Sequence, residues 1–124
     1  MGRKTIVFDF DGVIHKYSRG WQDGSIYDEP VEGIKEVISE LHKTYDIFIV
    51  STRCRKLSGE REMTLWLEKY GIEYDGLTSI KVPAIVYVDD RGLTFDPKNI
   101  KNLVNDIKNF EPWQNKQNQQ KQLF

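Results

Sequence analysis

Two pairs of acidic residues stand at the ends of apolar segments in this sequence. Asp9 and Asp11 are separated by Phe10, and Asp89 and Asp90 are adjacent. Two carboxylates a few ångströms apart repel each other unless a cation or a shared proton lies between them. Carboxylate oxygens suit Mg²⁺, which often binds one or two of them together with a phosphate. Each pair alone could cap a turn or face solvent, but both pairs at one place predict a site for a metal ion and a phosphate.

Hydroxyl and cationic residues occupy comparable positions. Ser51, Thr52 and Arg53 follow another apolar segment, and Lys81 precedes the third by a few residues. When carboxylates lie close together without nearby positive charge, each one makes the ionisation of the next more costly. A contribution to stability alone therefore does not explain why these acidic residues occur together. We therefore predict a functional site where these segments end. The basic residues 55–56 belong either to a solvated loop or to an electrostatic approach for an anionic substrate.

The segments that must position these residues alternate between strand and helix patterns. Strands are predicted at the three apolar runs, residues 5–9, 46–51 and 84–89, and shorter ones at residues 77–81 and 93–95. Helical spacing of apolar residues is found in residues 31–44, 59–70 and 97–109. Runs that are apolar throughout are typical of strands buried on both faces of a parallel sheet. The pattern predicts a three-layer α/β/α, Rossmann-like domain, with the site at the carboxyl ends of the strands.

The composition indicates one soluble domain. The chain has 124 residues with a net charge of −1, which argues against a general nucleic-acid coat or a basic membrane binder. Its single cysteine, Cys54, excludes an internal disulfide and a Cys-cluster zinc site. Apolar runs are too short for a membrane span and no secretory signal is recognised, which predicts a cytoplasmic protein. We expect one domain over residues 1–111 and a disordered Gln/Asn-rich tail over residues 112–124.

Residues 12–30 have no clear period and are long enough for a functional flap. Cationic and aromatic residues alternate there, and such a loop could stack a base and bind a phosphate. Lys16 and Tyr17 are the predicted substrate contacts. The alternative is that Trp21 and Tyr27 anchor the flap while its cations are solvated.

Four short motifs resemble those of the haloacid dehalogenase (HAD) superfamily of phosphohydrolases. They are residues 8–13, residues 49–51, Lys81 and residues 88–90. They occur in the order of the family and span most of the predicted domain. The resemblance implies a HAD-type fold with no large cap domain, because the segments between the motifs are too short to hold one.

The resemblance also implies a role for each matching residue. Asp9 corresponds to the nucleophile that becomes an aspartyl phosphate, and Asp11 to the general acid and base. Ser51 would hydrogen-bond the transferring phosphoryl group, and Lys81 would stabilise the nucleophile and the phosphate charge. Mg²⁺ would be held by the Asp9 carboxylate, the Asp11 main-chain carbonyl, Asp90 directly and Asp89 through water. The expected metal site therefore comprises Asp9, Asp11, Asp89 and Asp90.

Residues 49–53, 61–67 and 88–91 are similar to the phosphatase half of polynucleotide kinase-phosphatases. In that comparison Arg53 would contact the phosphate or the substrate, with Thr52 beside it where those enzymes usually have glycine. Without a cap, the site would be open, which suits a macromolecular end, a bulky nucleotide or closure by a neighbouring subunit.

The predicted activity is Mg²⁺-dependent hydrolysis of a phosphomonoester through an aspartyl phosphate. The substrate would be a phosphorylated small molecule, a nucleotide or a nucleic-acid end, and no stable protein partner is implied. The alternatives are a phospho-accepting signalling module and a non-catalytic HAD-fold binding protein. The Asp-x-Asp spacing after the first strand favours a nucleophile with its own acid/base over a signalling receiver.

Overall fold

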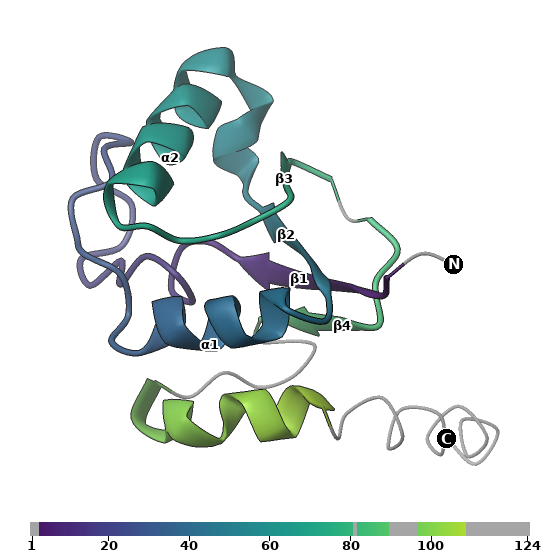
Figure 1. The fold of residues 1–124 in the computed structure, drawn as a ribbon. Helices are drawn as coiled ribbons and strands as arrows, with labels where there is room; N and C mark the ends of the chain where they lie inside the picture. Colours follow the sequence, from purple (N-terminus) through teal and green to yellow (C-terminus); the bar gives the residue numbers. More distant parts are fainter. Residues whose placement is uncertain (1–2, 81, 90–96, 109–124) are drawn as a thin grey trace, which may run out of the picture.

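The computed structural model describes residues 3–80, 82–89 and 97–108. Its sheet has four parallel strands in the order β3-β2-β1-β4 (Figure 1). The strands are β1 (Thr5–Asp9), β2 (Asp46–Val50), β3 (Gly76–Thr78) and β4 (Val86–Val88). The predicted α/β class with a parallel sheet is confirmed. The predicted strand at residues 93–95 and the predicted tail at residues 112–124 lie outside the described residues.

Helices lie between the first three strands and again after β4. They are α1 (Ile34–His42), the 3₁₀ helix η1 (Thr52–Arg55), α2 (Leu57–Lys69) and the 3₁₀ helix η2 (Pro97–Asn102), which residues 103–108 continue as α-helix. The predicted helices are confirmed with shifted ends; α1 begins only after Gly33, whose positive φ of 86° turns the chain into the helix. No helix among the described ranges is long and apolar enough to cross a membrane.

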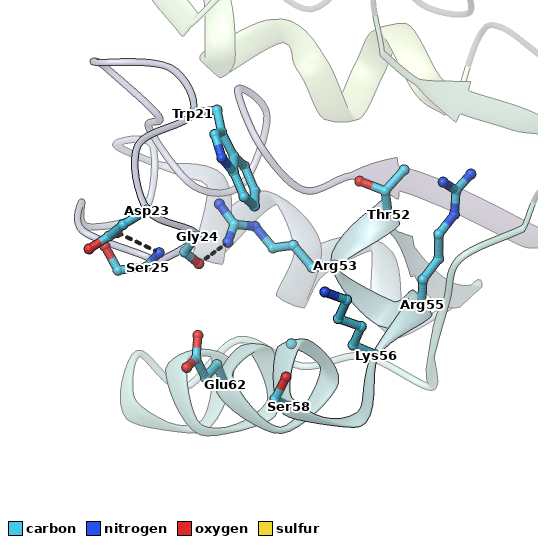
Figure 2. A pocket seen from close by; sticks show the side chains of 11 residues that line it. Trp21, Asp23, Gly24, Ser25, Thr52, Arg53, Arg55, Lys56, Ser58 and Glu62 are labelled. Carbon is cyan, nitrogen blue, oxygen red and sulfur yellow. Dashed lines mark hydrogen bonds between the residues drawn. The ribbon is translucent and has the colours of Figure 1, made fainter.

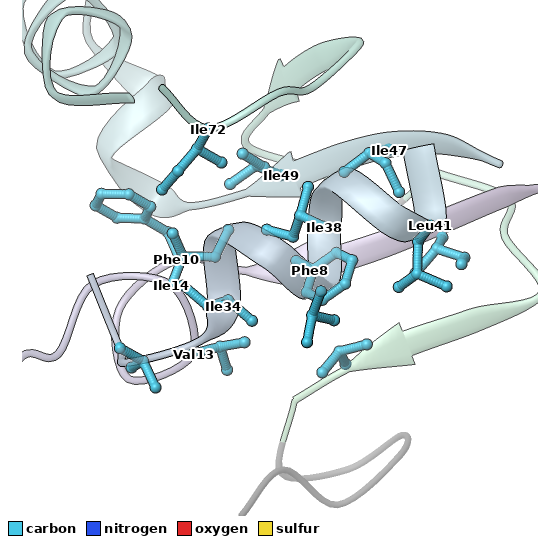
Figure 3. Close-up of a cluster of buried hydrophobic side chains, with 14 of the residues drawn as sticks. Phe8, Phe10, Val13, Ile14, Ile34, Ile38, Leu41, Ile47, Ile49 and Ile72 are labelled. Atoms are coloured by element: carbon cyan, nitrogen blue, oxygen red, sulfur yellow. The ribbon is translucent and has the colours of Figure 1, made fainter. Parts of the chain in front are cut away.

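The main core covers one face of the sheet. Successive side chains of a strand point to opposite faces, so Ile6 and Phe8 share a face with their partners on β2 and β4. This face packs against the apolar stripe of α1, and Figure 3 shows Phe8 and Ile49 of the sheet near Ile38 of the helix. The same buried cluster includes the apolar stripe of α2 together with Leu103 and Ile107. Crossovers between parallel strands are almost always right-handed. Because β1 to β2 and β2 to β3 step in the same direction, both helices lie on the same side.

The opposite face is less covered, so the prediction of strands buried on both faces is confirmed for the centre of β1 and is wrong for β2 and β4. Val7 is fully buried, but its neighbours Phe48 and Tyr87 are only half-buried, and exposure alternates along β2. The Tyr87 hydroxyl donates a hydrogen bond to the Val82 carbonyl, so the chain leading into β4 lies on this face. Since no described helix crosses between β3 and β4, an apolar run here does not mean burial on both sides.

A histidine joins α1 to the loop before β3. His42 lies with Nδ1 2.9 Å from a Glu73 carboxylate oxygen and Nε2 3.2 Å from the Asp75 carboxylate. Hydrogen bonding to Asp75 and then to Glu73 raises the pKa of His42 against the opposing effect of burial. Burial alone would raise the pKa of Asp75, but the Ile47 N–H and His42 outweigh it and lower the value. Hydrogen bonds from Ser39 and His42 lower the pKa of Glu73.

This cluster predicts a stability that depends on pH. A raised folded-state pKa means that the contribution of His42 is complete below its ordinary 6.5 and is lost as the pH rises through the raised value. The lowered pKa values of Glu73 and Asp75 mean that their contribution is lost only in acid, as the pH falls through those values. The gap in unfolding free energy between the protein and its His42→Gln variant is therefore expected to shrink between about pH 6 and about pH 9. Urea unfolding at both pH values measures it, and a constant gap would contradict the assignment.

Candidate active site

The carboxyl ends of three strands meet at one edge of the sheet. Asp9, the last residue of β1, pairs with Val50 at the end of β2, and the preceding Phe8 pairs with Val88 of β4. Val50 therefore lies beside Asp9 on β2 with Ser51 one residue further along, and the register of β4 places Asp89 beside Asp9 on the other side. Adjacent strands lie about 5 Å apart. The register thus brings together three of the predicted site residues, as the sequence led us to expect.

The chain turns sharply after β1. The Asp9 Oδ1 atom accepts the Phe10 backbone N–H at 3.0 Å, and the Phe10 side chain is fully buried in the core. Gly12 follows with a φ of 87°, a conformation that side chains rarely allow. The turn is closed by hydrogen bonds from the Gly12 N–H to the His15 carbonyl (2.8 Å) and from the His15 N–H to the Phe10 carbonyl (2.9 Å). It brings the side chain of His15 back to that of Asp11.

The Asp11 carboxylate is held by two side chains. Arg53 Nε donates to Oδ2 at 3.0 Å and Nη2 donates to Oδ1 at 3.2 Å, the bidentate geometry typical of an arginine and a carboxylate. His15 Nδ1 lies 2.9 Å from Oδ1. Arg53 is buried with 9% exposure, and its Nη1 also donates to the Gly24 carbonyl of the flap. The residue predicted to contact substrate is therefore, in this structure, the partner of Asp11.

Sequence reasoning missed the role of His15. The ring is fully buried, and its Nε2 accepts the backbone N–H of Asp28 at 3.1 Å. Because Nε2 is an acceptor, the proton of the neutral ring is on Nδ1, which donates to Asp11. His15 thus fixes the rotamer of the Asp11 carboxylate. In the sequence, this role is indicated only by the position of His15 directly after two apolar residues, Val13 and Ile14.

The turn after β2 positions Ser51 and Arg53. The buried Ser51 accepts the Arg53 N–H on Oγ at 3.1 Å and donates its own N–H to the Thr78 carbonyl of β3 at 2.9 Å. Gly59 in the first turn of α2 lies against this turn, since a Cβ atom there would be 2.2 Å from the Arg53 carbonyl oxygen. Only glycine allows η1 and α2 to approach so closely. Thr52 is exposed beside them.

The two arms of the flap are joined to each other by backbone hydrogen bonds from the Lys16 N–H to the Glu29 carbonyl and from the Val31 N–H to the Ile14 carbonyl. The Trp66 indole N–H, which donates to the Asp28 carbonyl, joins the flap to α2. The Tyr27 hydroxyl accepts from the Arg19 N–H and donates to the Gly20 carbonyl, so its hydrogen bonds stabilise the flap internally and do not anchor it to the body.

The two predicted substrate contacts of the flap differ in their surroundings. Lys16 is exposed and pairs with Glu29 at 2.6 Å, which raises its pKa through a hydrogen bond and the charge of that carboxylate. Tyr17 has a positive φ of 57° and packs edge-on against the His15 ring. Desolvation and then the charge of Asp11 raise the pKa of Tyr17, so this side chain lies close to the Asp11 carboxylate.

A cavity of about 630 Å³ adjoins the site between the flap and the start of α2 (Figure 2). Thr52 and Arg53, which follow Ser51, form the side nearest to the strand ends. Trp21 lines the cavity from the flap and is 62% exposed, and its ring contacts the body at its edge of the cavity, over the Arg53 guanidinium.

Oxygen atoms at this edge of the sheet are the kind of ligands that Mg²⁺ binds. Asp9 and Asp89 supply two carboxylates on neighbouring strands, which matches the one or two that Mg²⁺ commonly takes from a protein. The Asp11 carboxylate is turned to Arg53 and His15, which leaves its main-chain oxygen as the donor expected from the resemblance. Within the described ranges no group of three His, Cys, Asp or Glu side chains is arranged to hold a metal. Lys81 and Asp90 lie outside the described residues. The carboxylates that are described fit the ion.

No family model, curated protein or solved structure matches this chain. Evidence for its function therefore comes from its own residues and their arrangement.

Proposed function

We propose that this protein is a Mg²⁺-dependent phosphatase of the HAD type that hydrolyses a phosphomonoester through an aspartyl phosphate on Asp9. The observation that carries the proposal is the strand register, which brings Asp9, Ser51 and Asp89 to one edge of the sheet. The Asp11 carboxylate beside them is held by Arg53 and His15. Phosphoryl transfer requires mainly positioning and charge neutralisation, and these groups can supply both.

In the first step, an Asp9 carboxylate oxygen attacks phosphorus and the bond from phosphorus to the leaving oxygen breaks. Asp11, in its protonated form, gives its proton to the leaving oxygen. In the resting site Arg53 occupies both oxygens of Asp11. The dianionic phosphate of the substrate competes for that guanidinium, and its arrival frees Asp11 to carry the proton.

In the second step, Asp11 accepts a proton from water, the water oxygen bonds to phosphorus, and the bond to Asp9 breaks. Free phosphate leaves, and Asp9 is restored. Ser51 Oγ already accepts the Arg53 N–H, so its own O–H is directed to another acceptor, and a phosphoryl oxygen at the strand ends meets this requirement. Lys81 is proposed to stabilise the negative charge.

The metal ion would be held by the carboxylates of Asp9, Asp89 and Asp90 and by the main-chain oxygen of Asp11. When bound, Mg²⁺ supplies positive charge that offsets both the clustered carboxylates and the phosphate. The like charges of Asp9 and Asp89 on neighbouring strands favour such a cation. The three-layer arrangement typical of the superfamily belongs to this proposal, because the described helices account for one face of the sheet.

The first experiment measures phosphate release from an aryl phosphate with Mg²⁺, with EDTA and after Mg²⁺ is restored. Repeated turnover that EDTA abolishes and Mg²⁺ restores is expected. The Asp11→Asn variant is expected to lose at least about a hundredfold of the activity, as is usual for general acid–base groups. Asp106→Asn, the same change at an exposed position on the helix of residues 103–108, serves as the matched control.

The alternative functions give different results in the same assay. A phospho-accepting module would label Asp9 once from a small phosphate donor without sustained release. A binding protein would release no phosphate while it remains folded and binds Mg²⁺. Either result would overturn the phosphatase proposal.

A further inference from the structure

The cavity beside the site has a charged group of opposite sign at each end. Arg55 and Lys56 line the end next to Thr52, and Asp23 and Glu62 line the other end (Figure 2). Lys56 points into the cavity, and Arg55 extends along its side next to Thr52 (Figure 2). Neither cation forms an ion pair within the part of the chain that the structure describes. The cavity therefore offers one end for an anion and one end for hydrogen-bond donors.

Asp23, at the acidic end, is ionised at neutral pH. Asp23 Oδ1 accepts the backbone N–H of Ser25 at 3.0 Å. Hydrogen bonds from the Ser25 side chain and then from its backbone lower the pKa of Asp23. An ionised carboxylate only accepts hydrogen bonds, so a ligand group at this end must be a donor.

An aromatic ring lies between the two ends. Trp21 packs over the Arg53 guanidinium, with 5.2 Å between the guanidinium carbon and the ring centroid, and Arg53 is itself fixed by Asp11. The ring is nevertheless 62% exposed. Exposed aromatic side chains supported in this way are the usual stacking platforms for bases, because every base has a flat π-face.

We propose that this cavity binds the nucleoside part of a nucleotide, with the base stacked on Trp21. The amino group of cytosine, adenine or guanine donates to the carboxylates of Asp23 and Glu62. The phosphate lies at the opposite end, between Thr52 and the cations Arg55 and Lys56. The assignment of this phosphate as the one that is hydrolysed rests on the proposed function, but the binding of the nucleoside does not.

The size and polarity of the cavity favour a nucleotide over a sugar phosphate. About 630 Å³ is enough for a base, a sugar and a phosphate. A sugar phosphate would satisfy the cations but would leave Trp21 without a stacking partner. It would also bring hydroxyls, which are weaker partners for two carboxylates than an amino group with two N–H donors.

The test compares three ligands by calorimetry in EDTA, so that binding is measured without turnover. Cytidine monophosphate and uridine monophosphate differ at ring position 4 in the amino group, and ribose 5-phosphate lacks the base. We expect cytidine monophosphate to bind at least about tenfold more tightly than ribose 5-phosphate, as base stacking on an aromatic ring typically allows. Uridine monophosphate should bind several-fold more weakly than the cytidine nucleotide.

Two variants at Trp21 test whether its ring stacks on the base, and they distinguish this role from an effect on folding. Trp21→Ala is expected to reduce the affinity for cytidine monophosphate to that for ribose 5-phosphate, and Trp21→Phe is expected to keep most of the preference. Leu65→Ala, which removes another exposed apolar side chain outside the cavity, should change neither. Melting curves for each variant establish that it is folded.

Equal affinity for the three ligands, or a preference that survives Trp21→Ala in a folded variant, would overturn the inference. The two proposals fail separately. Selective nucleotide binding without any phosphate release would contradict the proposed phosphatase activity and support the proposed nucleoside site. Turnover of an aryl phosphate without selective binding would do the reverse.

Discussion

Replacing Asp9 by asparagine is expected to reduce kcat/KM for phosphate release at least about a thousandfold, because the amide oxygen is a poor nucleophile toward phosphorus. The fold should not suffer. Asparagine keeps an Oδ1 atom that can accept the Phe10 N–H as Asp9 does. The melting temperature is therefore expected to change little.

The measurement is steady-state phosphate release with Mg²⁺, together with melting curves of both proteins. Asp46→Asn provides the matched control, since Asp46 is at the other end of the sheet, at the start of β2. It should keep full activity. If Asp9→Asn retains most of the turnover while the control behaves normally, Asp9 is not the nucleophile.

The second large effect is expected at Arg53. Arg53→Met keeps the length of the side chain but leaves the Asp11 carboxylate and the Gly24 carbonyl without their donor. Arg53 is buried and Asp11 is partly buried, with 5% and 22% side-chain exposure, so little water can replace the lost bonds. The expected loss of unfolding free energy is about 2–3 kcal/mol. Turnover should fall as well, because Asp11 loses the group that orients it.

Urea unfolding measures the loss, and Arg55→Met is the control. Arg55 is exposed and should change stability by less than about 0.5 kcal/mol. Arg53→Lys keeps the charge without the bidentate fork and should be intermediate. In a double-mutant cycle with Asp11→Asn, the two changes should be strongly non-additive. Additive effects would mean that the contact between Arg53 and Asp11 does not stabilise the protein.

The strands and the edge at which the site lies were predictable from the sequence. Residues 6–8, at the centre of the predicted strand 5–9, are all apolar, and the predicted bounds are those of β1. Once the strands are parallel, Asp9, Ser51 and Asp89 must meet at one edge, whatever the details of the loops. It was less predictable which face of the sheet other elements cover. An apolar residue such as Phe48 is equally suited to a fully buried and a half-buried position.

The contacts of Asp11 could not be predicted. Arg53 is distant in the sequence, and it reaches Asp11 only because η1 turns the chain directly after Ser51. His15 is near in the sequence, yet its role depends on the turn at Gly12 and on a hydrogen bond from Asp28 across the flap. Such contacts depend on the path of two loops, and neither loop has a periodic pattern from which its path could be inferred.

The glycine at position 59 limits how the substrate specificity of this protein can change. The backbones of η1 and α2 touch there, so the wall of the cavity that they form has a fixed position. A larger residue would push this wall apart and displace Arg53 with it. The opposite wall, residues 21–25, belongs to a surface loop, in which residues other than Gly24 can change without moving the body; Gly24 has a φ of 92° and its carbonyl accepts from Arg53. We therefore expect that a laboratory selection for new substrates would accumulate its substitutions in this loop and leave Gly59 unchanged.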